Sequence, residues 1–286
     1  AIGRDRELLS LAVARARWDG GSSLNDVADI FVANDWYSDA MGNSNNRCCG
    51  QGPASGSFGA RIVFDDDNHL YVTSGDRNWG ERAQDPGSHL GKILRLNDDG
   101  SVPDDNPFVG RAGYLPEIYT LGHRNPTGIR FDPETGELWS TEFGPRGGDE
   151  LNRIEAGKNY GWMLISQGEH YNDEPVELGT SGIDGFTDPV VAWPPSGNPG
   201  NLIVYRGDRF PEWRGDVFVA AMSRPGALVR VDIDENGAAT GEERLLSELG
   251  QRMRDVVEGP DGRIYVTTER SPFASPGAII VLEPAN

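Results

Sequence analysis

Short apolar runs bounded by turn residues recur along the chain. Four of them begin with an aliphatic residue followed by an aromatic one, at residues 70–73, 138–141, 217–220 and 264–267. Three of these runs follow segments rich in Asp, Pro, Asn or Gly: "FDDDNHLYV", "FDPETGELW" and "GPDGRIYV". Such residues favour the tight turns of β-hairpins, so each of the three runs is predicted to be the second strand of a hairpin.

A second signature follows each run. It reads "GKILRLNDDG", "DELNRIEAG", "ALVRVDIDENG" and "GAIIVLEPAN", and a fifth copy, "AVARARWDGG", stands near the start of the chain without a preceding partner. Strand clusters repeated at such long intervals are typical of propeller blades with long loops. We therefore expect an all-β chain with little helix.

Each blade is interpreted as four strands. The predicted strands are 60–63, 70–73, 92–97 and 117–121; then 128–132, 137–141, 150–154 and 190–193; then 201–205, 216–220, 227–232 and 243–247. A last group offers three strands, 253–258, 263–267 and 278–282, and two outer strands, 12–18 and 27–32, stand at the front. The chain is thus predicted to begin and end within a blade. No linker is evident, so residues 1–286 are expected to form a single β-propeller domain.

Composition and charge narrow the range of partners. The 286 residues are 37% hydrophobic, which suffices for a packed core, and no apolar run reaches the roughly 18 residues of a membrane span. The net charge of −19 repels phosphate backbones and argues against nucleic acid as a partner, while it suits cations.

Cysteine content and the amino-terminal residues give little information on disulfides or cellular location. Cys48 and Cys49 are adjacent and cannot form a disulfide framework, so we expect two thiols in a Gly- and Asn-rich loop. The first twenty residues lack the apolar core of a secretory signal. The chain is accordingly interpreted as cytoplasmic, as a mature form or as a fragment.

Polar residues gather in the segment "YTLGHRNPTGIRF", residues 119–131. Pro126 has no N–H to donate to a strand partner, so His123, Arg124 and Asn125 are predicted to lie on a connection between strands, where binding groups collect. A turn role for Asn125 is the alternative that residue type alone suggests.

A longer stretch around this segment carries a family resemblance. The segment "LGHRNPTGIRFDPETGELWSTEFGPRGGDELNRIEAGKNYGW", residues 121–162, resembles the soluble pyrroloquinoline quinone (PQQ) dependent sugar dehydrogenases, which include the glucose/sorbosone and aldose sugar dehydrogenases. Further matches are "LGKILRLNDDGSVPDDNPF", "RFPEWRGDVFVAAM" and "RMRDVVEGPDGRIYV". The resemblance implies a six-bladed β-propeller of which this chain holds roughly four to four and a half blades, because family chains carry nearly two further blades before its start. It also implies a periplasmic or secreted protein.

The resemblance assigns cofactor contacts residue by residue. Arg252 and Arg254 are similar to the family's arginine pair, and two positions apart on a strand they face the same side. Guanidinium groups suit the carboxylates of PQQ because they make paired charge-assisted bonds. Arg124 and Asn125 resemble two further cofactor contacts, and Gln84 resembles a pocket glutamine. His123 is expected to support them.

The resemblance also implies a calcium site and a reaction. Gly144 and Pro145 resemble the positions whose backbone carbonyls bind Ca²⁺, and Asp149 and Glu150 beside them are weaker candidates as ligands. Family members oxidise an aldose with PQQ as the oxidant, calcium as Lewis acid and a histidine as base. The implied partners are a sugar substrate and an external electron acceptor.

Two positions depart from the family pattern. Ser57 stands where the family has its catalytic histidine, and a serine hydroxyl is no base near neutral pH without a helper. Ser223 stands in place of a cofactor-binding lysine, and Arg224 beside it is the candidate substitute. The leading hypothesis is a PQQ- and calcium-dependent oxidation of aldoses to lactones. The alternatives are a catalytically impaired or non-enzymatic propeller that binds a ligand or partner, and a calcium-stabilised scaffold, which the acidic loops "FDDDN" and "PDDNP" favour.

Overall fold

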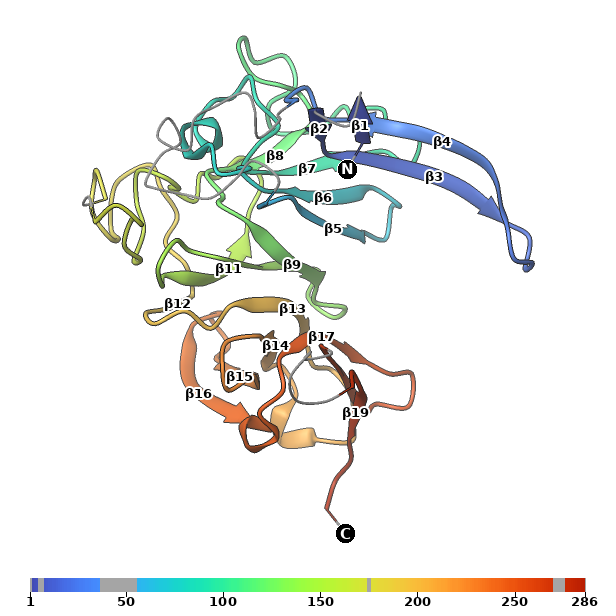
Figure 1. Cartoon of the computed structure of the whole chain (residues 1–286), viewed down its shortest axis with the longest axis vertical. Helices are drawn as coiled ribbons and strands as arrows, with labels where there is room; N and C mark the ends of the chain where they lie inside the picture. Colours follow the sequence, from blue (N-terminus) through green and yellow to red (C-terminus); the bar gives the residue numbers. More distant parts are fainter. Residues whose placement is uncertain (1, 5–7, 37–55, 174–175, 270–275, 286) are drawn as a thin grey trace. The chain divides into compact units, whose positions relative to one another are not determined.

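The computed structural model describes residues 2–4, 8–36, 56–173, 176–269 and 276–285 (Figure 1). Cys48 and Cys49 lie outside this part of the chain. The chain divides into two compact units. The first unit contains the described residues up to Asn125 together with 156–163 and 171–173, and the second contains 126–155, 164–170 and the rest of the described chain.

The first unit is built on one four-stranded antiparallel sheet. Its strands lie in the order β5 (Gly59–Phe64), β6 (Leu70–Ser74), β7 (Lys92–Leu96) and β8 (Ile118–Leu121). Every residue of the two middle strands is buried. A continuous apolar run such as "LYV" of β6 suits a strand that is covered on both faces, whereas β7, "KILRL", also buries Lys92 and Arg95.

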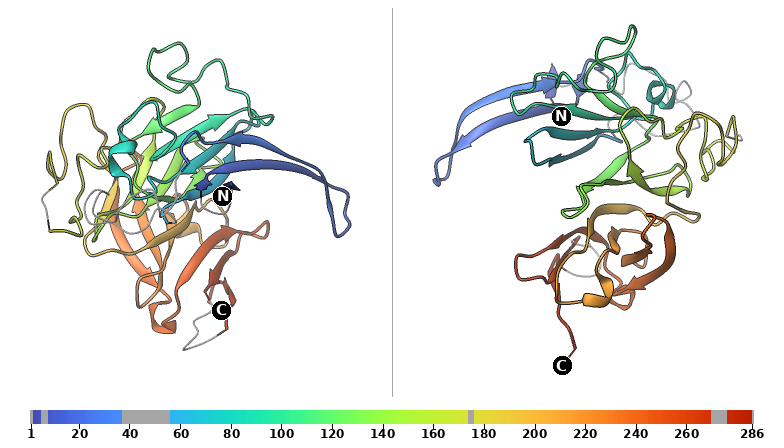
Figure 2. Two further views of the ribbon diagram at one scale, coloured as in Figure 1. Left: turned by 45° about the horizontal axis from the view of Figure 1, so that its top comes forward. Right: turned by 180° about the vertical axis from the view of Figure 1, so that it is seen from behind.

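Two smaller pairings accompany this sheet. Strands β3 (Ala12–Trp18) and β4 (Leu24–Val32) form a curved two-stranded ribbon that extends away from the β5–β8 sheet (Figures 1 and 2). Strands β1 (Ile2–Arg4) and β2 (Leu8–Ser10) form the second pair. The inner ends of the ribbon are anchored in the core of the unit, where Val13 and Phe31 belong to the same buried cluster as Leu94.

The second unit contains three sheets. The first runs in the order β12 (Val191–Trp193), β11 (Asp149–Ile154), β10 (Leu138–Glu142), β9 (Pro126–Phe131). The next has the order β13 (Pro199–Val204), β14 (Val217–Ala221), β15 (Ala227–Ile233), β16 (Ala239–Leu245). The last has three strands, β17 (Met253–Glu258), β18 (Ile264–Thr268) and β19 (Ile279–Leu282).

Apolar side chains join the sheets of the second unit. Trp139 and Leu151 of the first sheet share a buried cluster with Val204 and Val217 of the next. A further cluster joins that sheet to β17 and β18 through residues such as Phe218 and Val256. Each sheet is therefore covered by its neighbour along the chain.

The structure confirms the all-β class and the order of the strands. Among the described residues the helices are three short 3-10 segments, η4 (Gly80–Ala83), η5 (Pro211–Trp213) and η6 (Ser247–Leu249). No helix in this part of the chain has the length and apolar character that crossing a membrane requires. The three predicted hairpin turns are present, and each is closed by a backbone hydrogen bond: from Asp65 N to His69 O, from Asp132 N to Glu137 O and from Gly259 N to Arg263 O.

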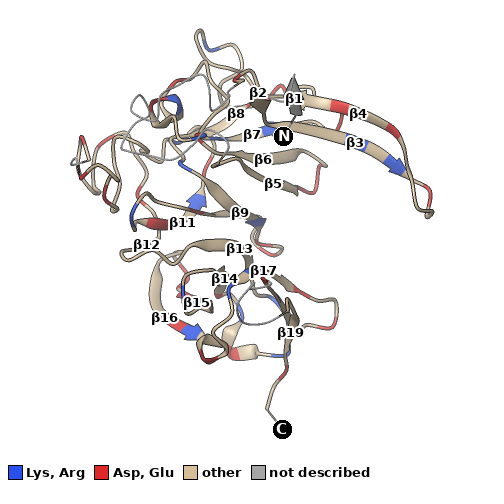
Figure 3. Cartoon of the chain, viewed as in Figure 1, with Lys and Arg blue, Asp and Glu red and all other residues tan. Residues whose placement is uncertain are grey.

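Most strand boundaries lie within two residues of the prediction, and those of β4 and β16 differ by up to three and four residues. The outer strand predicted at 243–247 is β16 at Ala239–Leu245, and Pro126 is itself the first residue of β9. A proline is tolerated there because the first position of a strand can do without an N–H donor. Figure 3 shows both acidic and basic residues along the described ribbon of each unit.

Candidate functional site

The connection after β8 carries three of the polar residues singled out in the sequence. His123 is fully buried, and its imidazole shares a 2.9 Å hydrogen bond with the hydroxyl of Thr120 and stacks on Tyr160 with 4.8 Å between ring centroids. Its backbone N–H donates to Gly91 O at 3.1 Å. These contacts agree with a supporting role for His123.

Arg124 is held by residues from two other segments of the first unit. Its backbone carbonyl accepts the N–H of Asp76 at 2.7 Å. Its guanidinium carbon lies 5.6 Å from the centroid of the Trp162 ring, and the indole N–H of Trp162 donates to the carboxylate of Asp76 at 2.8 Å. Asp76 and Trp162 thus fix the position of Arg124, and its guanidinium gains from the electron-rich aromatic face.

Asn125 and Ser57 adjoin this cluster. The side-chain oxygen of Asn125 accepts the N–H of Gly59 at 3.0 Å, and the hydroxyl of Ser57 donates to the side-chain oxygen of Asn78 at 3.1 Å. The N–H of Asn78 in turn donates to Asp76 at 2.8 Å. The amide oxygen of Asn125 therefore already holds a backbone group.

Gln84 reaches the same cluster through its amide. It exchanges two hydrogen bonds with the amide of Asn159, at 2.7 and 3.1 Å, and donates to the carbonyl of Trp162 at 2.6 Å. Gln84 consequently orients the segment that carries Trp162. Ser57, Gln84, Arg124 and Asn125 thus lie in connected segments of the first unit, and their role in binding stays a prediction.

The other histidines of the first unit contact groups other than Ser57. His69 lies in the β5–β6 turn, with 3.0 Å between its Nδ1 and a carboxylate oxygen of Asp65. His89 is buried, and its Nδ1 accepts the N–H of Asn34 at 3.0 Å. His170 is buried in the second unit. The described histidines of the first unit are thus engaged away from the hydroxyl of Ser57.

In the second unit, Asp149 organises the loop that contains Gly144 and Pro145. One of its carboxylate oxygens accepts the N–H of Gly144 at 2.9 Å, and the other accepts Asn198 N at 2.7 Å and the Ser196 hydroxyl at 2.5 Å. A Cβ at Gly144 would lie 2.2 Å from Gly147 O, so only glycine fits there. Both carboxylate oxygens of Asp149 therefore hold neighbouring groups in place, and its role as a metal ligand stays a prediction.

Two carboxylates face each other beside this loop. Glu142 and Glu150 are opposite residues of β10 and β11, and the side-chain amide of Asn152 donates to both, at 3.1 and 3.0 Å. Burial, followed by the nearby charge of Glu142, raises the pKa of Glu150 well above its usual range. No group of three or more His, Cys, Asp or Glu residues among the described positions is arranged to hold a metal ion. A cation at the predicted site would depend on backbone carbonyls, which are suitable hard ligands.

The predicted arginine pair meets at a residue that sequence reasoning missed. One carboxylate oxygen of Glu269 lies 2.8 Å from Arg254 Nε and 3.2 Å from Arg252 Nε, within ion-pair distance of both. Its backbone N–H donates to Arg252 O at 2.9 Å. Glu269 follows β18 in the sequence, and the register of β17 with β18 places it beside the pair. A carboxylate accordingly sits where the carboxylates of a ligand are expected to bind.

Ser223 and Arg224 stand at the position of the family's cofactor-binding lysine. Ser223 is partly buried and its backbone N–H donates to Gly197 O at 3.0 Å, whereas Arg224 is exposed. The predicted residues therefore fall into two sets. Ser57, Gln84, Arg124 and Asn125 belong to the first unit, and Gly144, Pro145, Arg224, Arg252 and Arg254 belong to the second.

Comparison with known proteins identifies the family. The model of the glucose/sorbosone dehydrogenase family matches residues 4–280. The chain belongs to this family. It is 42% identical over 270 residues to an uncharacterised protein of Synechocystis sp., covering 91% of this chain and 61% of that protein.

Solved structures agree with this membership of the glucose/sorbosone dehydrogenase family. The apo form of the soluble aldose sugar dehydrogenase of Escherichia coli matches with a TM-score of 0.81 and 34% identity, over 94% of this chain and 73% of that one. The PQQ-bound form of the aldose sugar dehydrogenase of Streptomyces coelicolor matches with a TM-score of 0.67 and 25% identity, over 95% and 71%. The chain spans about three fifths of the length of the curated relatives it matches.

Proposed function

We propose that this chain binds PQQ together with Ca²⁺ and oxidises aldose sugars to lactones, passing the electrons to an external acceptor. Family membership supports the class of reaction. The observation that carries the proposal is the arginine pair, in which Arg252 and Arg254 converge on one carboxylate oxygen of Glu269. Two guanidinium groups held side by side fit a ligand rich in carboxylates.

The residues present fit the implied groups in the second unit. Arg252 and Arg254 are 38% and 51% exposed at their side chains, so a ligand can reach them. Asp149 holds the loop of Gly144 and Pro145 through the N–H of Gly144, and backbone carbonyl oxygens of this loop are of the hard type that Ca²⁺ prefers. PQQ, when bound with calcium, supplies a polarised two-electron acceptor.

Gln84, Arg124 and Asn125 of the first unit are predicted cofactor contacts by the family resemblance alone. Arg124 is fixed by Asp76 and Trp162, and Asn125 by Gly59, so both side chains are oriented in advance. Pre-oriented groups bind a rigid cofactor without a large loss of side-chain entropy. Their contribution is a proposal that rests on the family resemblance.

A second function, ligand binding without turnover, is favoured by Ser57. Proton removal from the sugar hydroxyl needs a base with a pKa near the working pH. The Ser57 hydroxyl instead donates to the side-chain amide oxygen of Asn78, which is not a base. This chain would then bind the cofactor or a sugar but oxidise it very slowly.

The finer fold and the location remain predictions. We propose that the four-stranded and three-stranded sheets are blades of a six-bladed type of β-propeller, of which this chain holds four to four and a half, within the single domain expected for residues 1–286. We propose a periplasmic or secreted location on the strength of the resemblance alone.

A PQQ titration tests the proposal. The protein is freed of metal with a chelator and titrated with PQQ, with and without Ca²⁺, while the absorbance of the quinone is recorded. We expect saturable binding that strengthens with Ca²⁺ and that Arg254→Ala weakens at least tenfold. Glu248→Gln, an exposed change elsewhere in the second unit, is the matched control. Absence of saturable binding would sink the proposal, and binding without dye reduction by any aldose would establish the second function.

A further inference from the structure

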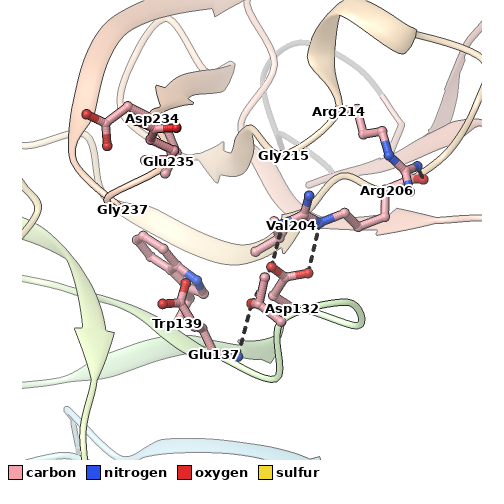
Figure 4. Close-up of a pocket in the computed structure, with 12 residues that line it drawn as sticks. Asp132, Glu137, Trp139, Val204, Arg206, Arg214, Gly215, Asp234, Glu235 and Gly237 are labelled. Atoms are coloured by element: carbon pink, nitrogen blue, oxygen red, sulfur yellow. Dashed lines mark hydrogen bonds and ion pairs between the residues drawn. The ribbon is translucent and has the colours of Figure 1, made fainter.

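The second unit contains a pocket that none of the predicted cofactor residues lines. Its volume is about 280 Å³. It is lined by side chains of the β9–β10 turn, of β10, of the β13–β14 connection and of the β15–β16 turn (Figure 4). Ligand pockets commonly measure roughly 300–1,000 Å³, so this one suits a small ligand.

The indole of Trp139 contributes a buried donor to this pocket. The Trp139 side chain is 2% exposed, and its Nε1–H has no hydrogen-bond partner in the part of the chain that the structure describes. A buried N–H without an acceptor is unfavourable, and native structures rarely keep one without a reason. A ligand with an acceptor group in the pocket would satisfy it.

The positive charges of the pocket are already compensated. Arg206 donates to both carboxylate oxygens of Asp132, at 2.9 and 2.6 Å (Figure 4). Arg214 pairs with Glu134. These guanidinium groups leave little attraction for an anion. The pocket therefore does not favour a phosphate or a carboxylate.

Carboxylates line the opposite side. Glu235 is exposed, and Asp234 uses one oxygen to accept the N–H groups of Asn236 and Ala238, both at 2.9 Å. Glu137 completes this side and pairs with Arg153 at 3.2 Å. These groups accept hydrogen bonds, whereas the Trp139 N–H requires an acceptor from the ligand. A cation would satisfy only the carboxylates.

Hydroxyl groups both donate and accept, so they match the two sides of the pocket together. We propose that this pocket binds a neutral polyhydroxylated molecule of monosaccharide size, an aldose or a polyol. One hydroxyl oxygen accepts from Trp139, and other hydroxyls donate to the carboxylates of Asp234 and Glu235. The pocket is a carbohydrate site separate from the predicted cofactor contacts and independent of PQQ and calcium.

The indole resonance of Trp139 provides a direct test. The ¹⁵N-labelled chain, with chelator and without PQQ, is titrated with D-glucose and, separately, with sorbitol. The Trp139 cross-peak is identified by its loss in Trp139→Phe, which keeps the aromatic ring and removes the N–H. We expect this cross-peak to shift saturably, with a Kd in the millimolar range.

Matched variants complete the test. Glu235→Gln keeps the shape of an exposed side chain and is expected to raise the Kd about fivefold, because a charge-assisted bond becomes a neutral one. Glu248→Gln is expected to leave it unchanged. A second titration uses methylguanidinium, a small cation. If Trp139→Phe does not fold, the proposal is still tested by two results. These are a saturable shift of one indole cross-peak and a higher Kd for that shift in Glu235→Gln. Three outcomes would overturn the proposal. The indole cross-peaks do not move with D-glucose or sorbitol, they move equally in Glu235→Gln, or they respond to methylguanidinium instead.

Discussion

The Arg206–Asp132 pair should be a main source of stability in the second unit. Asp132 is 2% exposed and lies at the β9–β10 turn, while Arg206 follows β13 in the neighbouring sheet. The guanidinium donates to both carboxylate oxygens, at 2.9 and 2.6 Å. Thr135 Oγ1 and the backbone N–H of Glu134 supply two further donors, at 2.6 and 3.1 Å. The perturbation is Arg206→Ala.

The expected loss of stability follows from the buried Asp132 carboxylate, which Arg206→Ala leaves without its guanidinium partner. Removing one partner of a buried ion pair costs about 3–5 kcal/mol, because the other charge stays buried. The Arg206 side chain is 21% exposed, and Thr135 and Glu134 still hold the carboxylate, so we expect the lower end, about 3 kcal/mol. Arg206→Lys keeps the charge but cannot bind both oxygens, and about half of that loss is expected.

The pH dependence separates the charge pair from simple packing. Burial raises the pKa of Asp132, but the hydrogen bonds from Arg206 and Thr135 outweigh it, so the pKa lies below its ordinary value of 3.8. A depressed carboxylate pKa contributes stability above the unfolded pKa, and this is lost as the pH falls through the folded pKa. The loss caused by Arg206→Ala should therefore be largest at pH 7 and shrink below about pH 4.

Urea unfolding followed by tryptophan fluorescence measures this loss at pH 7, 5 and 3.5. The wild type, Arg206→Ala and Arg206→Lys are compared at each pH. A loss that is the same at every pH would show that lost packing, not the charge pair, is responsible. A loss below about 1 kcal/mol at pH 7 would refute the reasoning, since that is the value of an exposed pair.

Three further predictions concern single residues. Ser57→His should raise dye reduction by PQQ, Ca²⁺ and an aldose by about 100-fold, the usual value of a general base; unchanged turnover with intact PQQ binding would contradict it. Glu269→Gln should lower the Kd for PQQ by at most about fivefold in the same titration, because exposed ion pairs are weak; weaker binding would show that Glu269 positions Arg254. Burial lowers the pKa of Lys92 to about 7 from 10.5, so urea unfolding should show stability rising between these pH values. Lys92→Met should abolish this rise, and an identical slope in both chains would exclude Lys92 as its source.

The strands that could be predicted from the sequence are those with an apolar signal. In β6, β10 and β14 every residue is buried, and the resulting apolar runs are bounded by turn residues. Strand β16 has the sequence "ATGEERL" and is largely exposed, so its position was misjudged. An outer strand is specified by its pairing with β15, which local hydrophobicity does not record.

The candidate site likewise contains residues that the sequence revealed and residues that it did not. The spacing of Arg252 and Arg254 predicted that they share a face, and the structure joins both to one carboxylate oxygen. Glu269, which provides that oxygen, had no local signal. The contact of Asp76 with Trp162 joins residues 86 positions apart, and no short motif could reveal it. Such partners depend on strand register and are found only in the folded chain.

The position of Ser57 is shaped by the backbone rather than by its side chain. Ser57 has a φ of 52°, and its carbonyl accepts the N–H of Arg77 at 3.2 Å. A Cβ on Gly75 would lie 2.0 Å from that carbonyl, so the two backbones touch closely. None of these contacts uses the Ser57 hydroxyl, and histidine is among the residues that tolerate a left-handed conformation. A change of side chain at this position can therefore leave the surrounding cluster intact, so the proposed cofactor binding and the proposed turnover can be tested separately.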